Sequence, residues 1–272
     1  MSKGETRLDL AMVERGLVEN RSKAKALILA GDVLVDDVPV TRAGAGVTAS
    51  QVISLKQKPR FVGRGGEKID HALDRFDVDV TGKVVADLGA CTGGFTDAVL
   101  QRGAAKVYAI DVGYGQLDLR LRDDPRVVVM ERTNARYLEA LPDPIDVVVI
   151  DVSFISLALI FPAVDRILAP DGVVVPLIKP QFEAGKQEVG KGGVVRDPKI
   201  HRKVLEKVVH DAAASGFQCG GLTASPLTGP AGNHEFLGVF RRSPEPLDSD
   251  RIGAMIDQAL AEYPGDLNLL YS

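Results

Sequence analysis

The sequence predicts an α/β fold with a mostly parallel, doubly wound, Rossmann-like sheet, preceded by a small α+β domain. Two observations predict it. From about residue 83 onward, short β-branched apolar runs alternate with helical segments, and the first of these runs ends in a glycine-rich turn. A chain of 272 residues has room for one large domain and one small one. We place the boundaries at residues 1–58, at 59–67 for a linker, and at 68–272.

Composition and charge exclude a disordered chain and indicate what the two domains bind or do. Hydrophobic residues make up 45% and charged residues 26% of the chain, which is typical of a globular protein and not of a disordered one. The net charge of −4 hides an asymmetry, because residues 1–60 carry 10 basic and 7 acidic side chains while the remainder carries 23 and 30. A basic small domain on an acidic body indicates that one part binds a polyanion and the other performs chemistry.

The cysteines and the apolar segments exclude several other classes. Cys91 and Cys219 lie far apart without metal-binding spacing, which argues against a zinc or iron–sulfur site and favours a reducing compartment. The N-terminus lacks the apolar core of a signal peptide, and Asp146 and Asp151 interrupt the one apolar stretch of membrane length, residues 145–164. We therefore expect a cytoplasmic protein with no metal site and no membrane contact. We also expect a monomer when the protein is free, with no evident protein partner.

Residues 6–57 predict two helices and three short strands. Apolar residues recur at helical spacing between Leu8 and Leu17, and a second helix runs from Ser22 to Ala30, with Ser22 as N-cap and Gly31 as C-cap. The predicted strands are Val33–Val35, Val38–Val40 after an Asp-Asp turn, and Val52–Leu55.

This order of elements resembles the RNA-binding domain named after small-subunit ribosomal protein S-four. The resemblance covers RLDLAMVERGLVENRSKAKALILAGDVLVDDVPV. It implies a basic face that meets RNA phosphates and is formed by Arg7, Arg21, Lys23 and Lys25. The alternative from the residue pattern alone is a small domain whose basic side chains are only solvated.

The segment KPRFVGRGGEK predicts a linker, because its proline and glycines break regular structure. A helix resumes near Lys68. Arg60 and Arg64 either continue the phosphate contacts of the first domain or serve solubility or a salt bridge between the domains.

The large domain is predicted from apolar runs without alternation, which are typical of parallel strands covered on both faces. These runs are Val84–Leu88, Val107–Ile110, Val127–Met130, Val147–Ile150 and Val173–Ile178, followed by further strands near Gln218–Ala224 and Glu235–Phe240. The predicted helices are Phe95–Arg102, Leu157–Leu168, Pro198 to about Ser215, and Ile252–Ala261.

The glycine-rich turn after the first strand indicates a nucleotide-like ligand. Asp87, Gly89, Gly93 and Gly94 form a D-x-G-x-x-x-G-G pattern, and glycines there let the backbone approach a ligand closely. A dinucleotide site prefers G-x-G-x-x-G. Asp111 closes the second strand 22 positions after Gly89, where an acid can accept hydrogen bonds from both ribose hydroxyls. An adenosyl ligand without a pyrophosphate fits better than NAD, and the pattern resembles S-adenosylmethionine-dependent methyltransferases.

A closer resemblance extends over nearly the whole chain. The motifs that carry it are GACTGGFTDAVLQRGAAKVYAIDVGYGQL, DPRVVVMERTNAR, DVSFISL, PLIKPQFEAGK and GNHEF. Together they resemble the TlyA family, historically labelled hemolysins. The resemblance implies a ribosomal RNA 2′-O-methyltransferase that acts on cytidine within a ribosomal subunit. The catalytic half also resembles the FtsJ-type RNA ribose methyltransferases, which use a Lys-Asp-Lys-Glu tetrad.

Carried over residue by residue, the resemblance implies a catalytic tetrad of Lys68, Asp151, Lys179 and Glu235. It also implies that S-adenosylmethionine is held by Asp87, Gly89, Ala90, Cys91, Gly93, Gly94, Phe95, Asp111, Asn134 and Asp151. Asn134 stands where FtsJ-type enzymes have an aspartate near the adenine.

The residues themselves support part of this assignment. Asp151 and Lys179 directly follow buried runs at the ends of neighbouring strands, so their charges must be paired or lie at the mouth of a cleft. A structural ion pair is the simpler alternative. A ribose hydroxyl needs a base, and a lysine can serve only when neutral, which a nearby positive charge favours. We therefore expect Lys179 to be the general base, Lys68 to supply that charge, and both acids to orient the lysines and the substrate.

One further loop and two alternative functions remain open. The segment EAGKQEVGKGGVV is either a surface loop or a substrate loop that brings Lys186 and Lys191 to RNA. The alternatives to the methyltransferase are an RNA-binding protein without catalysis and, following the older family name, a cytolysin.

Overall fold

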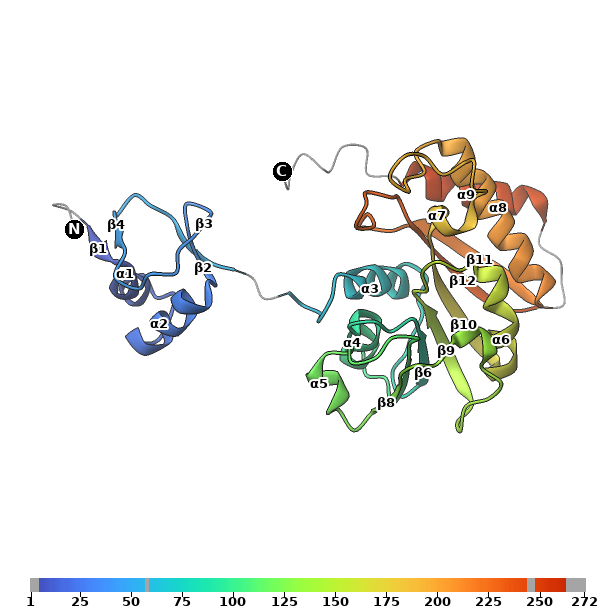
Figure 1. Cartoon of the computed structure of the whole chain (residues 1–272), viewed down its shortest axis with the longest axis horizontal. Helices are drawn as coiled ribbons and strands as arrows, with labels where there is room; N and C mark the ends of the chain where they lie inside the picture. Colours follow the sequence, from blue (N-terminus) through green and yellow to red (C-terminus); the bar gives the residue numbers. More distant parts are fainter. Residues whose placement is uncertain (1–4, 57–58, 244–247, 263–272) are drawn as a thin grey trace. The chain divides into compact units, whose positions relative to one another are not determined.

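A computed structural model of the chain describes residues 5–56, 59–243 and 248–262. The chain divides into two compact units, Met1–Pro59 and Arg60–Ser272. Figure 1 shows both, with the first unit in blue and the second in colours from cyan to red. Every helix in the described ranges is too short or too polar to cross a membrane.

The first unit has the predicted α+β architecture. Its helices are α1 (Leu8–Glu14) and α2 (Arg21–Ala30). Strands β1 (Thr6–Arg7) and β4 (Gly46–Val47) pair with each other. A second antiparallel sheet has the order β3-β2-β5, from β2 (Val33–Val35), β3 (Val38–Pro39) and β5 (Ile53–Leu55). Apolar side chains from both helices and from both sheets form one core.

Two local predictions in this unit need comment. The N-cap of α2 is Asn20, whose side chain accepts a hydrogen bond from the Lys23 backbone N–H, so the prediction of Ser22 as N-cap was wrong. Asn20 has the extended backbone that a cap requires, whereas Ser22 already lies in the first turn. The predicted C-cap is confirmed, because Gly31 adopts a left-handed conformation with φ of 75°.

A buried acid connects the helices of the first unit. Asp9 is fully buried and accepts hydrogen bonds from the Arg7 and Arg21 guanidinium groups at 3.0 and 2.9 Å. The hydrogen bond from Arg7 and, after it, the charge and hydrogen bond of Arg21 lower the pKa of Asp9 to about 2, although burial opposes this shift. Asp9 therefore fixes the position of two of the predicted RNA-binding arginines.

The second unit contains a seven-stranded sheet, and the prediction of a mostly parallel, doubly wound sheet is confirmed. The strand order is β11-β12-β10-β9-β6-β7-β8. The strands are β6 (Val84–Leu88), β7 (Lys106–Ile110), β8 (Val127–Met130), β9 (Ile145–Ile150), β10 (Leu168–Ile178), β11 (Phe217–Ala224) and β12 (Phe236–Arg242). Strand β12 runs antiparallel to β10 and β11, and the other pairs are parallel.

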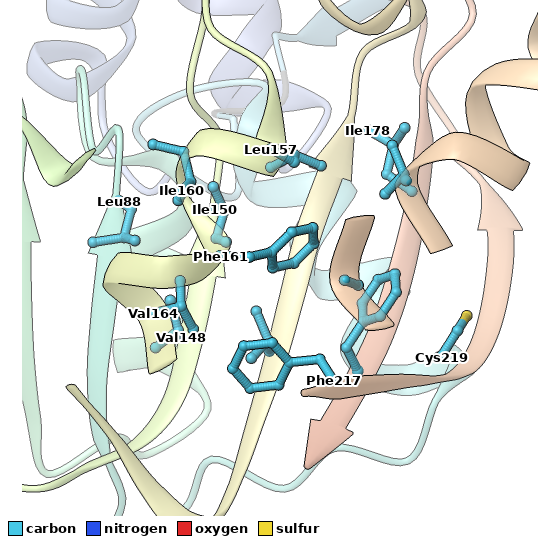
Figure 2. Packing of buried hydrophobic residues seen from close by; sticks show 14 of the residues in the cluster. Leu88, Val148, Ile150, Leu157, Ile160, Phe161, Val164, Ile178, Phe217 and Cys219 are labelled. Atoms are coloured by element: carbon cyan, nitrogen blue, oxygen red, sulfur yellow. The ribbon is translucent and has the colours of Figure 1, made fainter. Parts of the chain in front are cut away.

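Helices cover both faces of this sheet (Figure 1). One face carries α3 (Gly65–Arg75), α4 (Gly94–Gln101) and α5 (Leu119–Arg122); the other carries α6 (Phe161–Ile167), α8 (Pro198–Ala214) and α9 (Ser249–Ala261). Val147 and Val149 of β9 point to the first face, while Val148 and Ile150 point to the second, shown in Figure 2. Burial on both faces explains why the apolar runs do not alternate with polar residues.

Three predicted boundaries differ from the structure. Helix α3 begins at Gly65, so the predicted linker 59–67 extends too far by three residues. The predicted helix Leu157–Leu168 is divided into a short 3-10 helix, η2 (Leu157–Leu159), and α6, because Pro162 lacks an N–H and is accommodated in a helical first turn. Strand β12 begins at Phe236, which leaves Glu235 in the preceding turn.

We expect the substitution Asp9→Asn to loosen the first unit by about 2 kcal/mol, because a buried acceptor loses its charge-assisted hydrogen bonds. The lowered pKa means that Asp9 contributes stability above pH ~4 and loses it as the pH falls toward 2. Hydrogen exchange of the α1 and α2 amides in the full chain measures the effect, and the β6 and β9 amides serve as internal control. Unchanged exchange in both helices contradicts the prediction.

Candidate active site

The four residues of the predicted tetrad come together, although they lie in four distant segments of the sequence. Lys68 lies in α3, Asp151 follows β9, Lys179 follows β10, and Glu235 precedes β12. The Nζ atom of Lys179 is 2.6 Å from Oδ1 of Asp151, and the Nζ atom of Lys68 is 2.5 Å from Oε2 of Glu235. The tetrad is thus two ion pairs at one edge of the sheet.

The two ion pairs are electrostatically coupled. Burial raises the pKa of Asp151, whereas the positive charges of Lys179 and Lys68 lower it and the negative charge of Glu235 raises it further. Charged groups of both ion pairs therefore act on the Asp151 carboxyl.

The expected role of Lys68 needs revision. We expected its positive charge to act on Lys179, but its direct partner is Glu235, and the side chains of Lys68 and Glu235 are only 9% and 2% exposed. The Glu235 carboxylate compensates the Lys68 charge where it is buried. The Lys68 charge therefore acts on Lys179 together with the opposite charge of Glu235, and the two form a pair with no net charge.

Lys179 has further partners that sequence reasoning missed. Its ammonium donates to the backbone carbonyl of Val152 at 3.0 Å and to Oγ of Ser153 at 2.9 Å. Gln181 lies beside the other pair, with its amide 3.5 Å from the Glu235 carboxylate. The position of Ser153, two residues after Asp151 in DVSFISL, was the only sequence signal for these contacts.

An exposed aromatic side chain lies next to Lys179 and was also missed. Phe154 is 91% exposed and has a left-handed backbone with φ of 63°, which is costly for a bulky residue. Its ring centroid is 4.9 Å from that of Phe182, and the Lys179 ammonium lies 5.8 Å from the Phe182 ring. Strain and exposure at the mouth of a site are typical of a ligand contact.

Contacts within the protein require two glycines of the glycine-rich turn. Gly89 has φ of 92°, and a Cβ atom there would lie 2.7 Å from the backbone oxygen of Asp151. Gly93 has φ of 97°, and a Cβ atom there would collide with Leu121. The turn therefore packs directly against the end of β9, and only glycine fits at these two positions.

A small cavity of about 10 Å³ beside this turn, with room for about one water molecule, is lined by several of the predicted residues. Its walls include Ala90, Cys91, Asp111, Gln116 and Glu131. The Asp111 carboxylate accepts hydrogen bonds from the backbone N–H groups of Cys91 and Gly113 at 2.8 and 2.7 Å. Each carboxylate oxygen has a second lone pair, so Asp111 can still accept from ribose hydroxyls. A carboxylate acceptor in this position suits the ribose hydroxyls of an adenosine group.

Asp87 and Asn134 are placed differently from the prediction. Asp87 is fully buried, accepts a hydrogen bond from Oγ1 of Thr96 at 2.6 Å, and does not line the cavity. Burial raises the pKa of Asp87 to about 7, although the Thr96 hydrogen bond opposes this shift. The side chain of Asn134 accepts from the Arg136 N–H and caps the 3-10 helix η1 (Ala135–Tyr137).

The other predicted cofactor residues lie in and behind the turn. Gly94 begins α4, and Phe95 is 2% exposed in the core between α3 and the sheet. Phe95 therefore supports the turn from behind and does not line the cavity.

The predicted RNA-binding residues fall into two groups. In the first unit, Lys23 forms an ion pair with Glu19 at 3.3 Å and Lys25 is exposed, while Asp9 holds both arginines. In the second unit, Arg60 pairs with Asp70 of α3, and Arg64 donates to the Thr228 carbonyl at 3.2 Å.

Arg60 and Asp70 both belong to the second unit, so their ion pair lies within it. Asp70 is also bound by Arg102 at 2.6 Å. Arg60, Asp70 and Arg102 thus form one network of ion pairs. Because Asp70 already binds the Arg60 guanidinium, Arg60 is less available to RNA than the sequence suggested.

The loop with Lys186 and Lys191 is tied to the turn before Glu235. Both lysines are exposed. The side chain of Asn233 accepts from the Val195 N–H and donates to the Gly193 carbonyl, each at 2.9 Å. Because Asn233 is two residues from Glu235, the base of the loop is held next to the tetrad.

Comparison with known proteins identifies both units. The FtsJ-like methyltransferase family matches residues 61–242, and the S4 domain matches residues 6–53. The chain is 48% identical to the "Putative rRNA methyltransferase YqxC" of Bacillus subtilis, over 87% of this chain and 86% of the relative. It is 44% identical to the 16S/23S rRNA (cytidine-2′-O)-methyltransferase TlyA of Mycobacterium tuberculosis, over 95% of this chain and 98% of the relative.

A solved structure is also similar to this chain in sequence and in fold. The "Putative hemolysin" of Streptococcus thermophilus is 41% identical to this chain and superposes with a TM-score of 0.72, covering 96% of this chain and 98% of that protein.

We expect the raised pKa of Asp87 to make the protein less stable as the pH rises from 4 to 7. In this interval the unfolded chain has lost the Asp87 proton and the folded protein retains it, so the folded state binds more protons. The loss amounts to about 3 kcal/mol. Denaturant unfolding of the wild type and Asp87→Asn at pH 5 and pH 8 measures it, because the variant lacks this slope.

The exposed acid Asp171 provides the control, since Asp171→Asn should leave the pH dependence unchanged. A stability difference between wild type and Asp87→Asn that is the same at both pH values contradicts the prediction.

Proposed function

The chain belongs to the TlyA family of FtsJ-like methyltransferases, and on this premise we propose that it transfers a methyl group from S-adenosylmethionine to the ribose 2′-hydroxyl of cytidine in ribosomal RNA. The observation that carries the proposal is the contact between the two parts of the site. The glycine turn of the proposed cofactor cavity touches the backbone of Asp151, and Asp151 forms an ion pair with Lys179. A bound cofactor and a candidate base therefore share one edge of the sheet.

The cofactor supplies a methyl group already activated on a sulfonium, so the chain must mainly position the hydroxyl and remove its proton. Asp111, Ala90 and Cys91 hold the adenosine portion in the cavity. Lys179 in its neutral form accepts the hydroxyl proton. Asp151 and the Val152 carbonyl aim the amine, and the buried Lys68–Glu235 pair borders the substrate position.

In this proposal the first unit binds RNA, and Phe154 positions the target nucleotide beside Lys179. The S4 domain provides the basic face, where Lys25 is exposed and Asp9 fixes the two arginines. An exposed aromatic ring stacks on unpaired bases with about 1–3 kcal/mol per base. Phe154 beside Lys179 therefore stacks on the target base or its neighbour and brings the ribose to the amine.

The alternatives are separated by experiment. An RNA-binding protein without catalysis binds ribosomal RNA but transfers no methyl group. No observation in the described part of the chain favours the cytolysin alternative, so we propose one function.

We expect Lys179→Ala and Lys179→Arg to reduce methyl transfer about 10²–10⁴-fold, because general-base catalysis contributes about that factor and a guanidinium stays protonated. The assay is methyl transfer to isolated ribosomal subunits, with mass-spectrometric mapping of 2′-O-methylcytidine. Calorimetry should find unchanged cofactor affinity, since Lys179 does not line the cavity.

Asp111→Ala is the matched control with the opposite signature, because it removes a cavity residue and should weaken cofactor binding. If Lys179→Arg keeps near wild-type turnover, Lys179 is only an electrostatic contact to RNA and the general-base role is wrong.

We expect Phe154→Gly to lower methyl transfer at least tenfold without lowering the melting temperature. The exposed ring contributes little burial, and relief of the left-handed strain offsets the entropy that glycine loses on folding. Calorimetric unfolding measures the melting temperature, and the transfer assay measures the loss of activity. Loss of stability in parallel with activity shows that the ring supports the fold and does not contact RNA.

A further inference from the structure

Glu183 is a buried carboxylate that the proposed chemistry does not use. It ends the short helix α7 (Pro180–Glu183), four residues after Lys179, and is 6% exposed. Both of its oxygens contact the loop that follows β9. Oε1 accepts from the Leu157 backbone N–H at 2.7 Å, and Oε2 accepts from Oγ of Ser156 at 2.6 Å.

A lysine of α8 compensates the charge of Glu183. The Nζ atom of Lys207 is 2.9 Å from Glu183 Oε2 and 3.2 Å from Oγ of Ser156. The same ammonium lies 2.9 Å from Asp211. A carboxylate that is this deeply buried requires such a partner. Both oxygens of Glu183 therefore form hydrogen bonds within the protein.

These bonds form the second of two connections between the catalytic loops. At one end, Lys179 of the β10 loop contacts Asp151 and Ser153 of the β9 loop. At the other end, Glu183 holds the β9 loop by Ser156 and Leu157. The Phe154 and Phe182 rings, which are tilted by 47° with centroids 4.9 Å apart, lie in the segments between these ends.

The far connection is anchored in the core. The Leu157 side chain is 2% exposed and packs in the cluster that Figure 2 shows, near Ile160 and Phe161. Helix α7 has only four residues, too few to be stable by its own hydrogen bonds. Its position, and with it that of Lys179 and Phe182, depends on the contacts at its ends.

We propose that Glu183 is a positioning residue for methyl transfer, which holds the two catalytic loops at the separation that keeps Lys179 against Asp151 and Phe154 against Phe182. The proposal rests on the proposed function for its catalytic consequence. Glu183 acts on the geometry of the base and the stacking ring, and it does not line the cofactor cavity. Its loss should therefore lower kcat and leave the KM for the cofactor unchanged.

The test compares Glu183→Gln and Ser156→Ala with Asp211→Asn. The first two variants break the connection from opposite sides. Asp211→Asn removes the other carboxylate beside the same Lys207 at the same 2.9 Å distance, without touching either catalytic loop. Ser156→Ala keeps the proposal testable if Glu183→Gln folds poorly. Each variant is measured as the full chain for kcat, for the KM of S-adenosylmethionine and for melting temperature.

We expect Glu183→Gln and Ser156→Ala to lower kcat tenfold or more, with the cofactor KM within twofold of wild type. The double variant should lose little beyond the stronger single variant, because both break one connection. Asp211→Asn should keep kcat within twofold. Equal losses in all three variants, or losses that follow only the folded fraction, overturn the positioning role.

A second readout is independent of catalysis. Amine acetylation followed by mass spectrometry should modify Lys179 faster in Glu183→Gln than in wild type or Asp211→Asn, because a loosened loop exposes the amine of a side chain that is now only 11% exposed. Wild-type protein without methyl transfer refutes the proposed function alone. Unchanged Lys179 labelling in Glu183→Gln refutes the positioning role alone.

Discussion

The site depends on a close approach between two backbones at the end of β6 and β9. The Asp151 N–H donates to the Leu88 carbonyl at 2.9 Å, and Gly89 follows with no room for a Cβ atom against the Asp151 carbonyl. Parallel pairing of β9 with both β6 and β10 sets this edge. Because of that contact, the cavity beside Asp111 and the Lys179–Asp151 pair lie at the same edge of the sheet.

Three carboxyl groups share this edge, and each is compensated in a different way. Burial raises the pKa of Asp87, and the nearby charges of Asp151 and Asp111 raise it further. Asp111 is satisfied by two backbone N–H groups of the surrounding loops. Asp151 is held by Lys179. Mutual repulsion among the three carboxyl groups is thus reduced, because one is buried with a raised pKa, one bonds to the backbone and one pairs with a cation.

The sequence predicted the parts of this arrangement that follow from strand order. Parallel strands end at one edge of a sheet, so apolar runs followed by Asp151 and Lys179 place those two residues together. The pairing of Lys68 with Glu235 was not predictable from the pattern, because the two residues are 167 positions apart and their contact depends on how α3 and the turn before β12 pack. Phe154 gave no signal either, since its left-handed backbone is imposed by the folded loop.

Buried ion pairs contribute little to the stability of a fold, so the burial of Lys68 and Glu235 needs another explanation. Desolvation of two charges offsets most of their attraction, and well-packed apolar residues often stabilise a fold as much or more. Even so, Lys68 and Glu235 are almost entirely buried, and Gly229 leaves space for the Glu235 carboxylate, since a Cβ there would lie 2.5 Å from Oε1. The local backbone is thus adapted to a charge that the core does not need. That adaptation is expected when charged groups must be held next to a reacting hydroxyl, where a fixed, water-poor environment strengthens each interaction and needs no rearrangement during the reaction.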